Sequence, residues 1–328
     1  MASTLMKPQE ERKVSRVKSS LADSAGAGPI HVIRKPSILV VIPCYNEEVS
    51  IGSVVLRAYS YADHVVVIDD GSIDRTADIS RMAGAEVIRH EINQGKGAGI
   101  KHAFEYARTS AADILVLIDG DGQHNPDEIP LLVEPILKRE ADMVNGSRFL
   151  VKDRHHVPAY RRIGQDVLTL VTNAGSGQNI TDSQNGFRAF AKTTFDCFMF
   201  RENGMAIESE MLLDAATANL RIKEVQIDVR YDVAGSTYNP VVHGFSVLGS
   251  VIRGIVRRRQ TLAYGLPGLA LLIAGILALT FTVLGAPGIT TGAAIGYATL
   301  SMLSITIGAL CLFTVLVLKS MQGLRLRV

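Results

Sequence analysis

The most constraining stretch of this sequence is a short apolar run that ends abruptly in acidic and glycine residues. Ile114–Ile118 is continuously apolar, and Asp119-Gly-Asp121 follows it directly. A short apolar run without alternation predicts a strand that is buried on both faces, as in a parallel sheet. The two carboxylates would then lie at the carboxyl end of that strand, where open α/β sheets bind their ligands.

Asp119 and Asp121 are separated by one glycine, so both can approach a single divalent cation. Mg²⁺ commonly takes one or two protein carboxylates and completes its shell with phosphate oxygens and water. Aspartate and glycine are also frequent turn residues, so the same pattern is compatible with an ordinary turn. These residues alone leave both interpretations open.

The order of apolar run, polar turn and helix occurs repeatedly before this stretch. The predicted strands are Ile38–Ile42, Val65–Ile68 and Glu86–Arg89. The polar turns that follow them are Pro43–Glu48, Asp69–Ser72 and Asn93–Ala98. Such repeats predict right-handed βαβ units and a parallel sheet, with the turns meeting in one cleft. The predicted helices are Val49–Tyr59, a helix ending at Ala83, Gly99–Ala107 and Pro126–Glu140.

The glycines around Lys96 fit neither the Walker A loop nor the dinucleotide-binding fingerprint. Lys96 is interpreted as a flexible cation near a phosphate or sugar, and a solvated helix start is the alternative. Further along the chain, the predicted strands are Asp142–Asn145, Ala189–Ala191 and Ile222–Val229, and a helix is predicted near Met211–Ala218.

A basic stretch follows the strand at Asp142–Asn145. It contains Lys152, Arg154, His155, His156, Arg161 and Arg162. Such a cluster is usually a solvated face, but beside a di-acidic turn it can bind a second anion. The whole chain has a formal net charge of +2, which gives no sign of a nucleic-acid partner. Its three cysteines are widely spaced, which predicts neither a disulfide framework nor a zinc site.

The C-terminal part predicts a membrane hairpin. Leu262–Leu284 and Ile289–Leu318 carry no charge and are long enough to cross a bilayer. Arginines precede the first span, and basic residues follow the second, so both ends are expected on the cytoplasmic side. Gly288, Gly292 and Gly296 have the spacing of a close helix contact. We therefore expect a disordered basic tail at 1–36, a catalytic α/β domain at 37–240, an amphipathic juxtamembrane helix at 241–260 and the hairpin at 261–328.

The chain resembles family 2 glycosyltransferases of the GT-A fold, which has a Rossmann-like, mostly parallel sheet. Among them it is most similar to the polyprenyl-phosphate glycosyltransferases, which include dolichol-phosphate mannose synthase. The similarity covers residues 36–245. The segments that carry it, in chain order, are Ile42–Glu47, Ile68–Ser72 with Asp74, Asn93–Gly97, Asp119–His124 and Gly146–Phe149.

The resemblance implies a site with two substrates. The nucleotide-sugar donor would be bound by Pro43, Tyr45, Glu47, Asp70, Lys96 and Asp119. Mg²⁺ or Mn²⁺ would be bound by Asp119, Asp121 and Gln123. The phosphate of a polyprenyl or dolichyl phosphate acceptor would be bound by Arg148, Arg161 and Arg162. The resemblance further implies inversion at the anomeric carbon, with Asp121 and Arg148 essential for turnover.

Two segments depart from the mannose-synthase pattern. Asp182–Arg188 is longer than the usual form of its motif, and Asp232 and Tyr238 stand where two cations are expected. GDP-mannose therefore stays open as the donor beside a UDP-hexose or a UDP-N-acetylhexosamine. The partners would include the lipid bilayer of a cell membrane or an ER-type membrane. The hairpin would present the lipid, or serve only as an anchor or as a subunit contact in a homo-oligomer.

Two other functions fit parts of the sequence. One is a polysaccharide-chain glycosyltransferase of the same family, although such synthases usually contain a Gln-x-x-Arg-Trp motif and this chain has no tryptophan. The other is a non-catalytic membrane protein that binds nucleotide sugars. The separate arginine cluster favours an enzyme, because a protein that only binds a nucleotide sugar needs no second anion site.

Overall fold

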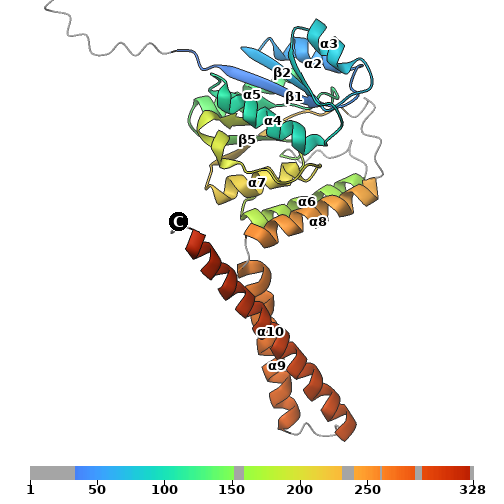
Figure 1. Ribbon diagram of the computed structural model, residues 1–328, viewed down its shortest axis with the longest axis vertical. Coiled ribbons are helices and arrows are strands. Elements are labelled where there is room, and N and C mark those ends of the chain that lie inside the picture. The colour runs from blue at the N-terminus through green and yellow to red at the C-terminus, as the bar shows by residue number, and fades with distance from the viewer. Residues whose placement is uncertain (1–33, 151–158, 231–239, 259–260, 285–289, 326–328) are drawn as a thin grey trace, which may run out of the picture. The chain divides into compact units, whose positions relative to one another are not determined.

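The computed structural model describes residues 34–150, 159–230, 240–258, 261–284 and 290–325. Its strands form one sheet in the order β3-β2-β1-β4-β6-β5-β7. Figure 1 shows this sheet with helices packed around it. The strands are β1 (Ile38–Cys44), β2 (His64–Asp69), β3 (Glu86–Arg89), β4 (Ile114–Leu117), β5 (Met143–Ser147), β6 (Arg188–Ala191) and β7 (Ile222–Gln226). Most of the predicted basic tail lies outside the described residues.

The sheet is mostly parallel, as the sequence predicts. β1 pairs in parallel with both β2 and β4, and β2 pairs in parallel with β3. β6 is the exception, because it runs antiparallel to β4 and to β5. The four N-terminal strands therefore end at one edge, which carries the predicted polar turns. The predicted strand Ile222–Val229 is shorter than expected, because β7 ends at Gln226.

Helices cover both faces of the sheet because the strands are apolar on both sides. Val40 and Ile42 pack with α2 (Ile51–Ala58) and α5 (Ile129–Leu137) on one face. Leu39 and Val41 pack with α4 (Lys96–Thr109) and α7 (Ile207–Thr217) on the other face. The remaining helical segments of this region are α3 (Thr76–Met82), η1 (Pro126–Glu128) and η2 (Lys192–Cys197).

Two further helices pack against α7. The amphipathic helix predicted at 241–260 is present as α8 (Pro240–Arg258). It packs against α6 (Ala159–Ser176), which the sequence analysis does not predict. Leu168 of α6 and Val247 and Val251 of α8 share a small apolar cluster with Ala206, which lies just before α7. The basic stretch therefore leads into a helix with an apolar face, and not only into a solvated segment.

The predicted hairpin consists of a π-helical turn η3 (Thr261–Gly265), α9 (Leu266–Val283) and α10 (Thr291–Arg325). Ala263–Val283 and Thr291–Ser320 are long and apolar enough to span a membrane. The glycine stripe predicted to join them is wrong. A Cβ added at Gly292 or Gly296 would meet no described residue within 4 Å, and Gly288 lies outside the described part of the chain.

The two hairpin helices approach each other at other glycines. A Cβ at Gly268 would lie 2.7 Å from the Cβ of Cys311, and a Cβ at Gly308 would lie 2.7 Å from the carbonyl oxygen of Gly268. The hydroxyl of Ser304 also donates a hydrogen bond to the carbonyl of Leu271, at 2.9 Å. These contacts depend on which faces of α9 and α10 meet, which the spacing of glycines in one helix does not reveal.

Candidate active site

The di-acidic turn lies directly after β4, at the edge where β1 and β2 also end. The backbone N–H of Gln123 donates to Oδ1 of Asp121 at 2.9 Å, which holds that carboxylate within the turn. Burial, followed by the nearby charge of Asp119, raises the pKa of Asp121 to about 6. A carboxylate that is destabilised in this way gains from a cation that binds beside it.

Lys96 supplies one positive charge at this turn. Its Nζ lies 2.8 Å from Oδ1 of Asp119 and 2.8 Å from Oε1 of Glu208. Burial is the largest single influence on the pKa of Asp119 and would raise it, but the attraction of Lys96 and of the other positive groups nearby together lowers it. Lys96 is therefore held between two carboxylates in this structure, and the predicted flexible cation is wrong in that respect.

Glu208 and His124 are site residues that the sequence analysis does not assign to the site. Glu208 is buried at the start of α7, and its Oε2 has no hydrogen-bond partner among the residues that the structure describes. His124 is buried as well, with Nε2 at 3.9 Å from Oδ2 of Asp119. Burial lowers the pKa of His124 to about 4, so the ring is neutral near pH 7. Motif spacing cannot reveal Glu208, because Glu208 lies in α7, far along the chain from Lys96, the residue it contacts at 2.8 Å.

Arg148 enters the site from the end of β5. Its Nε and one terminal nitrogen contact the two carboxylate oxygens of Asp182 at 2.6 and 2.8 Å. This bidentate pair fixes the plane of the guanidinium group. Asp182 is 1% exposed, and Arg148 lowers its pKa although burial opposes the shift. The positive charge of Arg148 also contributes to the lowered pKa of Asp119.

Buried and partly buried charged side chains support the segment that carries Asp182. Glu224 of β7 accepts hydrogen bonds from the backbone N–H groups of Thr181 and Asp182, at 2.7 and 3.2 Å. Arg188 is fully buried and donates to the carbonyl oxygens of Asn185, Ser183 and Glu208. The segment between α6 and β6 is therefore held by two charged side chains, of which Arg188 is fully buried and Glu224 is partly buried.

The turn after β1 brings the predicted donor residues beside the di-acidic turn. Pro43 lies within β1, and Tyr45 is 40% exposed. Burial, and then the charge of Asp121, raise the pKa of Glu47 to about 7. The hydroxyl of Ser50 donates to the carbonyl of Gly120 at 2.7 Å, which joins the two turns directly.

Asp70 has a different environment from the one expected of a nucleotide ligand. Its carboxylate accepts hydrogen bonds from the backbone N–H groups of Gln94 and Gly95, at 2.9 and 2.7 Å. It also contacts Nδ1 of His90 at 2.7 Å. Asp70 is 5% exposed, so these contacts surround the carboxylate. In this structure Asp70 holds the loop that leads to Lys96.

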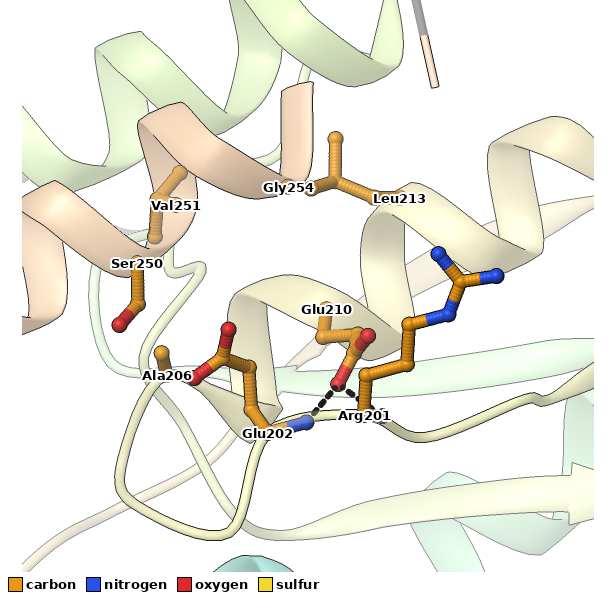
Figure 2. Close-up of a pocket in the computed structure, with 8 residues that line it drawn as sticks. All are labelled: Arg201, Glu202, Ala206, Glu210, Leu213, Ser250, Val251 and Gly254. Atoms are coloured by element: carbon orange, nitrogen blue, oxygen red, sulfur yellow. Dashed lines mark hydrogen bonds between the residues drawn. The ribbon is translucent and has the colours of Figure 1, made fainter. Parts of the chain in front are cut away.

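The glycines of that loop permit close packing against a neighbouring backbone. The N–H of Gly97 donates to the carbonyl oxygen of Asn203 at 2.7 Å, and a Cβ at Gly97 would lie 2.3 Å from the carbonyl oxygen of Glu202. Glu210 holds the same segment from its other side, because its Oε2 accepts the N–H groups of Arg201 and Glu202 (Figure 2). The pocket drawn in Figure 2 lies between α7 and α8, and no predicted site residue lines it.

Arg161 and Arg162 belong to the first turns of α6. Their side chains lie outside the part of the chain that the structure describes, as do Asp232 and Tyr238. The structure therefore brings together Glu47, Lys96, Asp119, Asp121 and Arg148, while the two arginines of α6 stay a prediction.

The residues present fit a divalent cation that is shared with a substrate. Among the described residues, no three His, Cys, Asp or Glu side chains form a group that could hold a metal ion by themselves. Asp119 and Asp121 offer oxygen ligands, and burial, followed by the charge of Asp119, destabilises the ionised form of Asp121, which a bound cation would stabilise. Mg²⁺ and Mn²⁺ prefer oxygen ligands, and Mg²⁺ in particular often takes its remaining ligands from substrate phosphates and water.

The known proteins that this chain resembles include glycosyltransferases. Residues 39–201 match the family model described as glycosyl transferase family 2. The UDP-N-acetylglucosamine–dolichyl-phosphate N-acetylglucosaminyltransferase of Methanococcus voltae is 34% identical over 59% of this chain and 86% of its own length. The undecaprenyl-phosphate mannosyltransferase of Micrococcus luteus is 29% identical over 69% of this chain and 97% of its own length.

A solved structure supports the fold. Glucosyl-3-phosphoglycerate synthase of Mycobacterium tuberculosis, crystallised with Mn²⁺, UDP and its product, matches with a TM-score of 0.51 and 24% identity. The match covers 68% of this chain and 80% of that chain.

Proposed function

Because the chain belongs to glycosyl transferase family 2, we propose that it transfers a sugar from a nucleotide sugar to a polyprenyl phosphate. The observation that carries the proposal is the convergence of Asp119, Asp121, Lys96 and Arg148 at one edge of the sheet. Opposite charges gathered in this way suit a reaction in which both the donor and the acceptor carry phosphate. The names of the relatives from Methanococcus voltae and Micrococcus luteus support the polyprenyl-phosphate acceptor.

Asp119 and Asp121, with Gln123, would hold Mg²⁺ or Mn²⁺ against the donor diphosphate. When bound, the metal would stabilise the negative charge that develops on the leaving nucleoside diphosphate. Lys96 contributes a further positive charge at Asp119, and the buried carboxylate of Glu208 holds that cation in place. The half-exposed ring of Tyr45 is available to the nucleotide, beside Pro43 and Glu47. In this arrangement Asp70 would act through the Gln94–Gly95 backbone.

Arg148 would orient the phosphate of the acceptor, together with Arg161 and Arg162. A lipid monophosphate is already an anionic nucleophile near neutral pH, so it needs orientation more than it needs a strong base. Asp182 keeps the guanidinium of Arg148 in one plane, which reduces the conformational freedom lost on binding. Attack by the acceptor oxygen on the anomeric carbon, opposite the leaving diphosphate, would invert the configuration at that carbon.

The hairpin would hold the catalytic domain on the cytoplasmic side of a membrane. The acceptor keeps its reactive phosphate at the headgroup level while its chain stays in the hydrocarbon. α8 ends in a basic segment, with Arg253, Arg257 and Arg258, and such residues favour an anionic membrane surface. The donor would be GDP-mannose, a UDP-hexose or a UDP-N-acetylhexosamine.

A direct assay tests this function. The purified protein is incubated with Mn²⁺, a polyprenyl phosphate and each nucleotide sugar of a panel, and labelled sugar is counted in the organic phase. We expect transfer from one donor class, which disappears in excess chelator. Binding of a nucleotide sugar without any organic-phase product would favour the non-catalytic function instead. A labelled product that stays in the aqueous phase would favour a polysaccharide acceptor.

A further inference from the structure

A buried carboxylate of α7 holds the segment at residues 199–203, which precedes that helix and which we call the strap. Oε2 of Glu210 accepts the backbone N–H groups of Arg201 and Glu202, at 2.9 and 2.8 Å (Figure 2). Glu210 is 4% exposed, so these bonds lie away from bulk water, where hydrogen bonds are stronger. Glu210 therefore fixes the backbone of the strap.

The strap in turn holds the first turn of α4. The carbonyl oxygen of Asn203 accepts the N–H of Gly97 at 2.7 Å. The first N–H groups of a helix have no partner within the helix, so this carbonyl supplies one from outside. The side-chain oxygen of Asn203 also accepts a hydrogen bond from Nζ of Lys101, one turn further along α4. Asn203 thus contacts the start of α4 through both its backbone and its side chain.

The contact leaves no room for a side chain between the strap and the donor loop. A Cβ at Gly95 would lie 2.5 Å from the carbonyl oxygen of Asn203, and a Cβ at Gly97 would lie 2.3 Å from the carbonyl oxygen of Glu202. Side-chain carbons do not approach other atoms so closely. The backbone of the strap therefore lies directly against the backbone on either side of Lys96.

Lys96 is consequently fixed from α7 in two ways. Its Nζ contacts Oε1 of Glu208 at 2.8 Å. Its backbone is flanked by the two glycines that lie against the strap, which Glu210 holds. A cation whose backbone and side chain are both held loses little conformational freedom when a ligand binds. The strap accordingly determines where Nζ of Lys96 can meet a diphosphate beside Asp119.

We propose that Glu210 is a positioning residue of the donor site, which acts through the strap and the backbone of residues 95–97 to place Lys96 for a nucleoside diphosphate. The inference rests on the proposed function, because it needs a nucleotide at Lys96. Without the Glu210 carboxylate, the strap loses two of its hydrogen bonds and the N–H of Gly97 loses a fixed acceptor. Lys96 can then take positions in which it does not meet the diphosphate.

The test uses the full-length protein and compares Glu210→Ala with Glu210→Gln. Hydrogen exchange at the amide of Gly97 is followed by mass spectrometry without ligand, and affinity for UDP or GDP with Mn²⁺, whichever binds, is measured by calorimetry. We expect Glu210→Ala to speed exchange at Gly97 and to weaken nucleotide binding roughly tenfold, the scale of one hydrogen bond to a charged group. Glu210→Gln should restore most of both properties, because its amide oxygen can still accept the two N–H groups.

Asp214→Ala is the matched control. Asp214 lies one turn further along α7, is also buried, and accepts the N–H of Met199 at 3.2 Å through its Oδ2. Its loss should loosen the start of the strap, far from the contact with Gly97. Exchange at Gly97 and nucleotide affinity should therefore stay close to those of the wild type.

A further variant tests the same contact from the opposite side. Gly97→Ala places a residue that favours helices in the first turn of α4, so the helix itself should form. The added Cβ would push the strap away from α4, and we expect faster exchange at the amides of Arg201 and Glu202 together with weaker nucleotide binding. This variant decides the proposal if Glu210→Ala does not fold, and wild-type exchange at both amides would then overturn it.

Two other results would overturn the inference. One is a folded Glu210→Ala protein whose Gly97 amide exchanges as in the wild type. The other is an equal loss of nucleotide affinity in Glu210→Ala and Asp214→Ala, which would indicate a general loosening of α7. A wild type that binds no nucleotide with Mn²⁺ would overturn the proposed function and the positioning role with it, whereas unchanged exchange at Gly97 overturns the positioning role alone.

Discussion

The two halves of the α/β domain are held together in different ways. In the donor half, which contains β1 to β4, side chains of one turn bind the backbone of the next. Oδ1 of Asn46 accepts the N–H of Ile73, and Asp70 accepts the N–H groups of Gln94 and Gly95. Each of these bonds joins consecutive strand–turn–helix units along the chain. The donor turns therefore form one continuous, locally connected edge.

In the acceptor half, which contains β5 to β7 with α6 and α7, the contacts join distant segments. Arg148 binds Asp182, which is 34 residues away, and Asn145 binds Glu224, which is 79 residues away. Arg188 is buried among three carbonyl oxygens that come from two separate segments. The comparison indicates that the donor half forms from repeated local units, whereas the acceptor half depends on a few long-range ionic contacts.

The largest effect should come from the acidic turn of the donor half. Asp121→Ala removes one of the two carboxylates proposed to hold the metal, and we expect turnover to fall on the order of 10³-fold. The measurement is sugar transfer to a polyprenyl phosphate with saturating donor. Asp127→Ala is the matched control, because Asp127 is an exposed carboxylate nearby that pairs with Arg57. Equal activity of the wild type in Mn²⁺ and in excess chelator would contradict the metal role.

A smaller effect, confined to the acceptor, should follow from Arg148→Ala. We expect kcat/KM for the lipid phosphate to fall about 100-fold, because the buried partner Asp182 also loses its cation. Nucleotide affinity, measured by calorimetry, should stay close to that of the wild type. Arg57→Ala removes an exposed arginine from α2 and serves as the control. If donor affinity collapsed together with activity, Arg148 would belong to the donor diphosphate, and the division into two halves would break down.

The support of Arg148 can be tested separately. Asp182→Asn keeps the size of the side chain but removes the charge that orients the guanidinium, and we expect about a tenfold rise in the acceptor KM. Asp142→Asn is a closely matched control, because Asp142 makes the same bidentate contact with Arg221 at an exposed site. An acceptor KM that rises equally in both variants would show that the effect is general destabilisation and not loss of orientation.

The same contrast explains what could be predicted from the sequence. The strands of the donor half and the turns with Glu47 and Asp119 could be predicted, because an apolar run followed by polar residues is a local pattern. Asp182 and Glu208 could not be assigned roles, because their partners Arg148 and Lys96 lie far away in sequence. The sequence does contain one signal for Glu208, which stands in the first turn of an apolar helix. If such a helix is buried, its acidic residue needs a cationic partner.

The errors have equally physical causes. α6 is hard to predict, because its first turns are basic and its apolar face is buried only where it packs against α8. The spacing of the glycines in α10 shows that a close contact is allowed and not that it is made. The fixed position of Lys96 depends on its second partner, Glu208, which comes from α7. Each error concerns a contact between segments that are distant along the chain.

The smallest expected effect concerns the hairpin. Its removal should affect the use of the lipid acceptor but not the binding of the nucleotide. No described residue beyond Ile255 belongs to the apolar clusters of the α/β domain, so a fragment that ends at Gln260 should fold. This fragment should bind the nucleotide as tightly as the full chain does, because every donor turn is retained. It should use long polyprenyl phosphates in membranes less well than short soluble analogues.

The expected difference between the two acceptors is modest, about fivefold, because the basic segment of α8 is still present and each basic residue near an anionic surface contributes about 1 kcal/mol. Ratios of kcat/KM for long and short acceptors, compared between fragment and full chain, measure it directly. Gly292→Leu in the full chain is a control for changes in the hairpin that do not disturb the α9–α10 contact, since a Cβ there would meet none of the described residues within 4 Å. An equal fractional loss on both acceptors would mean that the hairpin anchors the enzyme without presenting the lipid.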